Sequence, residues 1–295
     1  MNYRKTNAYP NLQRDLQFFP LGVEEPVVLT SDQINSYNKD GFLYPIKIFN
    51  QPEVIFIREY FDDLLDKALS SGWNSYEIMN WHKHCKGIYE ILTDYRILDV
   101  VQDLLGESVI LRHSHFFVKL PGDGKQISWH QDSSYWPLSK SRVVSVWLAI
   151  DDSDIENGAM KVIPGSHLKN QLPFIDSKEE ENNVLSQTVP DAEKYGMTST
   201  ILELKSGEIS LHSDWTLHGS DVNSSKRRRC GLAMRFLSND VKAYNGWNSH
   251  SVVCRGTDPT GHWANNPRPS SENIPKKEKS NRNKTLEGMI ETKEK

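Results

Sequence analysis

The spacing of apolar residues changes near position 108 and divides the chain into a helical first part and a strand-rich second part. Between residues 51 and 70, apolar side chains recur every three or four positions, which predicts an amphipathic helix. Its expected inward face consists of Val54, Ile57, Phe61, Leu64, Leu65 and Ala68. Two further helices are predicted: one capped by Thr30 or Ser31 and stopped at Gly41, and one over about 94–105 that ends before Gly106.

Beyond residue 108 the apolar residues form short runs separated by turn sequences such as Asn157-Gly158, Pro164-Gly165 and Ser206-Gly207. These runs predict strands at 109–111, 115–118, 143–150, 160–163, 209–212 and 231–236, and a short one is expected at 42–44. Helices followed by many strands are typical of an all-β barrel or sandwich that is buttressed by N-terminal helices.

The remaining segments are polar, and they set the expected boundaries of a single domain over residues 28–264. Residues 1–27 contain three prolines and are expected to form an arm lying over the domain. The acidic stretch 176–200 is interpreted as a long surface loop, with an active-site lid as one role for it. Residues 265–295 carry many charges and little that is apolar, so they are expected to be a disordered tail.

The composition narrows the class of protein but not its chemistry. A hydrophobic content of 37%, a charged content of 25% and a net charge of −4 fit a soluble globular protein without a strong attraction to nucleic acid or membranes. The sequence has neither an apolar run of the roughly 18 residues that a membrane span needs nor an evident signal peptide. Three widely spaced cysteines predict reduced thiols and a cytoplasmic location.

The clearest sign of chemistry is the triplet His130-Gln131-Asp132. In an extended strand, side chains two positions apart point to the same face, so His130 and Asp132 can bind one metal ion. His218, 88 residues further on, is the best candidate for a third ligand. Two histidines and one carboxylate leave three coordination positions open, as in non-haem Fe(II) oxygenases. An isolated triplet of this kind is more often a histidine that happens to lie near an exposed aspartate.

A second feature is the basic run from Lys226 to Arg229. Lys226 and Arg227 are expected in a basic turn that is solvated or touches nucleic acid. Arg229 differs because it directly precedes the buried run 230–236, where a charge needs a partner. A guanidinium in that position can form a bidentate pair with a carboxylate, such as the far carboxylate of 2-oxoglutarate.

Three ordered stretches resemble the phytanoyl-CoA dioxygenase family of Fe(II)/2-oxoglutarate oxygenases, over about residues 28–240. They are WHQDSSYWPL with VVSVWLAIDD, then ENGAMKVIPGSH, then LHGSDVNSSKRRRCGLAMRF. The resemblance implies a double-stranded β-helix, that is, a cupin-like jelly roll with N-terminal helices. It also implies Fe(II), 2-oxoglutarate and O2 as cofactor and co-substrates. By the same resemblance, the metal ligands are His130, Asp132 and His218, and the co-substrate contacts are Arg229, Ser220, Gln131 and Trp147.

The resemblance leaves the reaction partly open. In a chlorinating branch of the family, Ala or Gly replaces the carboxylate ligand, so the presence of Asp132 favours hydroxylation over halogenation. A small polar metabolite is the expected substrate; oxidative cyclisation, desaturation or halogenation of an amino-acid-like substrate and a non-catalytic cupin-like binding protein are the alternatives. Arg235 fits an anionic substrate or a structural ion pair equally well, and His212 is not expected to be a ligand. The residues expected on the substrate side are His115, Tyr135, Trp136, Trp215, Arg235, Asn245 and Trp247.

Overall fold

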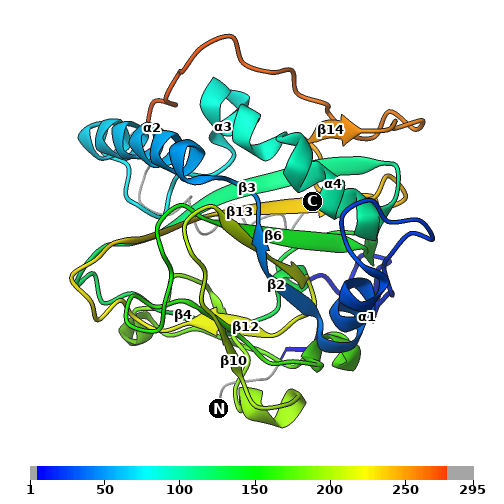
Figure 1. Ribbon diagram of the computed structural model, residues 1–295. Helices are drawn as coiled ribbons and strands as arrows, with labels where there is room; N and C mark the ends of the chain where they lie inside the picture. Colours follow the sequence, from blue (N-terminus) through cyan, green and yellow to red (C-terminus); the bar gives the residue numbers. More distant parts are fainter. Residues whose placement is uncertain (1–4, 278–295) are drawn as a thin grey trace.

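Two antiparallel sheets form the centre of the protein, which is seen in a computed structural model that describes residues 5–277 (Figure 1). In order across it, the larger sheet consists of β14 (Val252–Arg255), β3 (Val109–Lys119), β13 (Arg229–Leu237), β6 (Val143–Ala149), β11 (Glu208–Ser213) and β2 (Phe42–Lys47). The smaller sheet consists of β10 (Thr200–Leu202), β7 (Met160–Val162), β12 (His218–Ser220) and β4 (Ile127–His130). This architecture confirms the predicted jelly roll.

Helices cover the outer face of the larger sheet, as Figure 1 shows for α2 and α4 above strands β3 and β13. Residues 5–277 contain four α-helices: α1 (Ser31–Asp40), α2 (Gln51–Ser70), α3 (Lys86–Leu92) and α4 (Tyr95–Leu105). In α2 the six predicted inward residues are the buried ones, and Asn50 caps its N-terminus in a capping box with Glu53. The predicted helical buttress is therefore confirmed, with helix α3 as an addition.

Alternation along the strands separates a helix-facing core from an inner face. On β13 the side chains of Leu232, Met234 and Phe236 join the helix-facing core. The residues between them, among them Ala233 and Arg235, therefore point to the inside, between the two sheets. Every residue of β13 is buried, so its polar side chains lie inside the barrel and not in water.

Several sequence expectations are corrected by the structure. The two runs 109–111 and 115–118 belong to one strand, β3, which pairs with β13 on one side and β14 on the other. The arm contains a short strand, β1 (Asp15–Phe18), which pairs in parallel with β5 (Lys140–Ser141). Single-turn 3-10 helices occur at Trp81–Lys83, Asp132–Ser134, Ser166–Lys169, Glu179–Glu181 and Ala192–Tyr195.

The stretch 176–200 packs more closely on the domain than a free surface loop would. It includes β9 (Gln187–Thr188), which pairs with β8 (Ile175–Asp176), and the Val189 backbone amide donates to the Trp129 carbonyl at 2.7 Å. Gln187, Val189 and Ala192 are buried. The segment is thus attached along the free edge of β4.

The predicted disordered tail is ordered as far as residue 277. Glu272 accepts hydrogen bonds from the Tyr60 hydroxyl at 2.8 Å and from the Gly87 backbone amide at 2.6 Å. The Trp73 indole donates to the Pro275 carbonyl at 2.9 Å. The segment is mostly polar, and its order rests on these hydrogen bonds together with Ile274, which packs against the helix-facing core. The rest of the predicted tail, 278–295, lies outside the described residues.

Among the helices of residues 5–277, none has both the length and the apolar character that a membrane crossing requires.

Candidate metal centre

Strand pairing brings the three predicted ligands together. His130 ends β4 and His218 begins β12, and the two are direct partners across the antiparallel ladder. Asp132 opens the 3-10 turn that follows β4. Within the described residues, this is the one group of three or more His, Cys, Asp or Glu side chains that could share an ion, with ligand atoms within 4.8 Å of one another.

The distances suit an ion with these three ligands. Asp132 Oδ1 lies 3.7 Å from His130 Nε2 and 4.0 Å from His218 Nε2. Ligands bound side by side to one ion at about 2.1 Å are about 3 Å apart, so each of these two pairs needs to close by about 1 Å or less. All three side chains are buried.

Both imidazoles are held with their Nε2 atoms free for a metal. His130 Nδ1 donates to the Ser128 carbonyl at 2.8 Å, and His218 Nδ1 donates to the Thr216 carbonyl at 2.8 Å. A carbonyl can only accept, so Nδ1 carries the proton and Nε2 keeps its lone pair. Burial, followed by the neighbouring His130 and His212 imidazoles, lowers the pKa of His218 well below its usual range. The neutral form that binds metals is therefore favoured.

The Asp132 carboxylate is oriented by the groups around its other oxygen. Oδ2 accepts a hydrogen bond from Ser145 Oγ at 2.9 Å, and it lies 3.6 Å from Arg235 Nε and 3.7 Å from His212 Nε2. Burial acts to raise the pKa of Asp132, but the Arg235 guanidinium and the imidazoles outweigh it and lower this pKa well below its usual range. Oδ1 is thus left as an ionised ligand atom facing the two histidines.

His212 supports the site without joining the triad. Its ring lies 4.5 Å from that of His218, yet its Nε2 faces Oδ2 of Asp132 and not the oxygen that faces the two ligand histidines. This position agrees with the expectation that His212 is not a ligand. Sequence reasoning did not identify its contact with Asp132, nor that of Ser145, because both depend on the pairing of β6 with β11.

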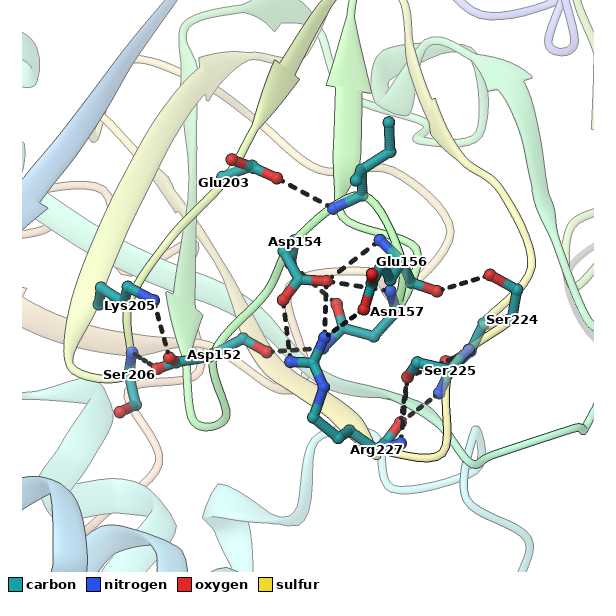
Figure 2. Close-up of polar contacts among 12 residues, drawn as sticks. Asp152, Asp154, Glu156, Asn157, Glu203, Lys205, Ser206, Ser224, Ser225 and Arg227 are labelled. Atoms are coloured by element: carbon teal, nitrogen blue, oxygen red, sulfur yellow. Dashed lines mark hydrogen bonds and ion pairs between the residues drawn. The ribbon is translucent and has the colours of Figure 1, made fainter.

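The basic run from 226 to 229 divides between the surface and the interior. Figure 2 shows the Arg227 guanidinium between two acids: it lies 2.8 Å from Asp154 and 3.2 Å from Glu156. Arg228 forms a two-pronged pair with Asp151 at 2.7 and 3.0 Å. Arg227, Arg228 and Asp151 line a surface cleft of about 840 Å³, and both arginines there already have acidic partners within the protein.

Arg229 points inward from the same run and has no acidic partner among residues 5–277. It is 2% exposed, its Nη2 is 3.5 Å from Ser220 Oγ, and its guanidinium carbon is 5.4 Å from the centre of the Trp147 ring. Its Nε has no hydrogen-bond partner. Burial lowers the pKa of Arg229 to about 10, which leaves it charged at neutral pH. An unpaired buried guanidinium beside a hydroxyl fits a carboxylate ligand.

Gln131 is a correction to the predicted co-substrate contacts. Alternation turns its side chain away from the face that carries His130 and Asp132. Its amide donates to the carbonyls of Asn170 and Trp215 at 2.9 and 2.7 Å and accepts from the Leu172 amide at 2.7 Å. The side chain therefore ties three backbone segments together.

The residues expected on the substrate side fall into two groups. Tyr135 lies beside His130, with ring centres 6.0 Å apart, and Trp136 stacks near Arg235 and another arginine, Arg112. His115 is buried, and its Nε2 bonds to the Tyr76 carbonyl at 2.7 Å.

The other members of that set lie further from the triad or are already engaged. Trp215 is fully buried against Gln131. Asn245 is exposed in a turn with φ of 56°, whereas Trp247 covers Arg112, with 5.1 Å between the guanidinium carbon and the ring centre. Arg112 was missed because it falls between two apolar runs that read as separate strands.

The chain is similar in sequence to known dioxygenases. The sequence pattern of phytanoyl-CoA dioxygenase (PhyH) matches residues 37–231. A probable alpha-ketoglutarate-dependent hypophosphite dioxygenase of Stutzerimonas stutzeri is 29% identical over 174 residues, which span 58% of this chain and 58% of that relative's length. An ectoine dioxygenase of Bordetella bronchiseptica is 25% identical over 236 residues, covering 71% of this chain and 76% of that protein.

A solved structure agrees with the sequence matches. The apo form of the non-heme monooxygenase ThoJ superposes with a TM-score of 0.67 at 25% identity, covering 81% of this chain and 88% of that one.

Proposed function

The chain belongs to the phytanoyl-CoA dioxygenase family, and from that premise we propose that it is an Fe(II)- and 2-oxoglutarate-dependent dioxygenase. The observation that carries the proposal is the convergence of His130, Asp132 and His218, with both histidine Nε2 atoms and one carboxylate oxygen facing one another. Two nitrogens and one oxygen on one side of an ion leave room for a bidentate co-substrate and O2.

In this proposal the three ligands hold ferrous iron, which supplies the site where O2 is activated as 2-oxoglutarate is decarboxylated to succinate and CO2. The backbone carbonyls behind the two histidines fix the ring orientation, and Ser145 fixes the carboxylate. Burial of the triad excludes bulk water, which favours oxidation of the substrate over side reactions.

Arg229 and Ser220 are proposed to bind the far carboxylate of 2-oxoglutarate. The supporting observations are the burial of Arg229, its lack of an acidic partner among residues 5–277, and its closeness to Ser220 and Trp147. Trp147 forms the wall against which the guanidinium lies. A charge-assisted pair of this kind is typically worth about 1.5–3 kcal/mol, which is enough to select a diacid.

The proposed reaction is hydroxylation of a C–H bond of a small polar metabolite. The ionised Asp132 occupies the carboxylate position that halogenating relatives leave open, so chlorination is disfavoured. Oxidative cyclisation or desaturation with the same cofactors is the alternative, because both begin with the same hydrogen removal. A cytoplasmic setting is part of the proposal and is supported by the free thiols of Cys85, Cys230 and Cys254.

A succinate-release assay with Fe(II), 2-oxoglutarate and a panel of metabolites tests the proposal, followed by mass analysis of each product. Asp132→Ala is expected to abolish substrate-coupled succinate release, because it removes one of three ligands. Arg229→Ala is expected to raise the KM for 2-oxoglutarate more than it lowers kcat. Full activity of either variant contradicts the corresponding assignment. Ferrous iron and 2-oxoglutarate binding without any turnover on the panel would instead support a binding protein.

A further inference from the structure

Two buried arginines lie on the inner face of the barrel close to the triad. Arg112 on β3 is 2% exposed and Arg235 on β13 is 6% exposed. Arg235 Nε lies 3.6 Å from Oδ2 of Asp132, which places this guanidinium at the edge of the metal centre. The function proposed above assigns no role to Arg112.

A β-bulge brings the two arginines to the same side of the sheet. Arg235 pairs with His113, but the next residue of β13, Phe236, pairs with Leu111. Arg112 is therefore the extra residue of the bulge, opposite no residue of β13. A bulge lets two successive side chains lie on the same side of a strand, and bulges are frequent beside active sites.

Neither guanidinium is satisfied by the protein. Nε and Nη2 of Arg112 and Nε and Nη1 of Arg235 are buried without a hydrogen-bond partner among the described residues. Asp132 does not neutralise both, because its Oδ2 already accepts from Ser145 and its Oδ1 faces the histidines. Burial, followed by the nearby Arg235, lowers the pKa of Arg112 to about 9. Buried N–H groups without a partner are costly, and an anion bound between the two guanidinium groups would supply the missing acceptors.

Aromatic rings give the space around the two arginines a defined shape. The Trp136 ring centre is 4.6 Å from the Arg112 guanidinium carbon and 5.8 Å from that of Arg235. Trp247 lies 5.1 Å from Arg112, and Phe117 lies 5.7 Å from Arg235. All four distances are within the range of cation–π contacts, so the rings shield the guanidinium groups from water and leave their unpartnered N–H groups to a ligand.

This arrangement is separate from the proposed 2-oxoglutarate contact. Arg229 and Arg235 lie on the same face of β13, six residues apart. At about 3.4 Å per residue, their backbones are about 20 Å apart along the strand. Arg235 lies next to Asp132, whereas Arg229 lies beside Ser220 and Trp147, so the two guanidinium groups form distinct binding positions.

We propose that Arg112 and Arg235 bind an oxyanionic group of the substrate, either a carboxylate or a phosphorus oxyanion, and hold the bond to be oxidised beside the metal. The proposal rests on the dioxygenase function and names the class of its substrate. The contact between Arg235 and Asp132 supports it, because a ligand held by Arg235 lies next to a metal ligand. A relative is named for hypophosphite, which is itself a phosphorus oxyanion.

Anion binding by the full-length protein tests this assignment without turnover. The protein is loaded with Mn(II) and saturating 2-oxoglutarate, and inorganic phosphate, methylphosphonate and acetate are titrated at constant ionic strength. Calorimetry and tryptophan fluorescence follow binding, since Trp136 lies against both guanidinium groups. We expect saturable binding of at least one probe, and the order of affinities distinguishes a carboxylate from a phosphorus oxyanion.

Arg112→Met and Arg235→Met are each expected to weaken that binding at least tenfold, because each removes a charge-assisted hydrogen bond. Arg112→Lys and Arg235→Lys keep the charge but lose the planar arrangement of N–H donors. Their anion binding is measured instead if a methionine variant does not fold. The matched control is Arg255→Met on β14 of the same sheet, whose guanidinium already has acidic and amide partners, Asp99 and Gln102. It is expected to leave anion binding unchanged.

Three results overturn the proposal: no saturable binding of any probe, unchanged binding in all variants of Arg112 and Arg235, or loss of binding in Arg229→Met alone. The last result would place the anion at the proposed co-substrate contact. The titrations are repeated on metal-free protein without 2-oxoglutarate in the Arg229→Met background. Anion binding there, together with failure of the parent protein to bind Mn(II) and 2-oxoglutarate, refutes the dioxygenase function but retains the anion site.

Discussion

Adding a single methyl group at Gly231 is predicted to disturb the proposed co-substrate contact through Trp147. Gly231 lies on β13 between β3 and β6, and a Cβ built at this position would lie 1.8 Å from Trp147 Cζ2, against 3.4–4 Å for ordinary contact. The indole or the strand must therefore move by about 1.6 Å or more in Gly231→Ala. Because Trp147 packs against Arg229, this movement displaces the guanidinium that is proposed to hold 2-oxoglutarate.

The expected magnitude follows from overpacking of a well-filled interior. Such changes cost about 1–3 kcal/mol, and β13 is paired on both sides, so we expect a loss near the upper end. At about 2.1 cal/mol/K of unfolding entropy per residue, a loss of about 3 kcal/mol corresponds to a fall in Tm of about 5 °C for a chain of 295 residues. The KM for 2-oxoglutarate is expected to rise more than tenfold, since an error of 1 Å in positioning is felt strongly.

Thermal unfolding and succinate release measured at increasing 2-oxoglutarate concentration test this prediction. The double variant Gly231→Ala with Trp147→Phe removes the indole atoms that collide with the new methyl group. It is expected to regain part of the lost Tm, which gives a coupling energy between the two positions. A Tm within 1 °C of the parent protein, or identical losses with and without the indole, would refute the reasoning.

Three further outcomes are expected. Asp151 accepts hydrogen bonds from the Arg228 side chain and the Cys230 backbone amide, the two neighbours of Arg229 in the chain. Asp151→Asn should therefore lower the free energy of unfolding, measured by thermal unfolding, by about 2 kcal/mol. In steady-state kinetics it should raise the KM for 2-oxoglutarate and leave kcat little changed. Burial lowers the pKa of His82 to about 4, so the unfolded chain binds a proton at this residue at a higher pH than the folded protein does. The free energy of unfolding should therefore fall by about 2 kcal/mol between pH 7 and pH 5 because of this one group. Denaturant unfolding of His82→Gln should show a correspondingly flatter dependence on pH. Glu272→Gln weakens the hydrogen bond from Tyr60 and should lower Tm by a few degrees, whereas an unchanged Tm would mean that the Glu272 contacts do not stabilise the fold.

The helices show which parts of the fold could be predicted from local sequence patterns. Helix α2 was predictable in its bounds and its buried face because its period, its cap at Asn50 and its length are all local properties. Helix α3 was not predictable, because Gly87 near its start lowers helix propensity. A Cβ at Gly87 would lie 2.5 Å from the Tyr60 ring, so the glycine is required by a contact between helices that the sequence does not reveal.

In the candidate site, too, the residues set by local sequence were predictable and those set by contacts between strands were not. His130 and Asp132 could be recognised because they lie two residues apart, at the end of β4 and the start of the turn after it, and His218 because a third ligand was needed. Arg112 could not be placed, because its direction depends on a bulge, and a bulge is a property of two paired strands. The run of polar residues from Arg112 to Ser114 also interrupts the apolar pattern of β3, which made one strand look like two.

The direct pairing of His130 with His218 also affects the stability of the smaller sheet. β4 is the edge strand of that sheet, and it is joined to β12 by a ladder of only a few residues. An ion bound to both imidazoles would act as a cross-strand staple at the end of this ladder. Metal binding is therefore coupled to local folding. Hydrogen exchange of the β4 amides should slow when metal is added, whereas exchange in the helix-covered larger sheet should change little.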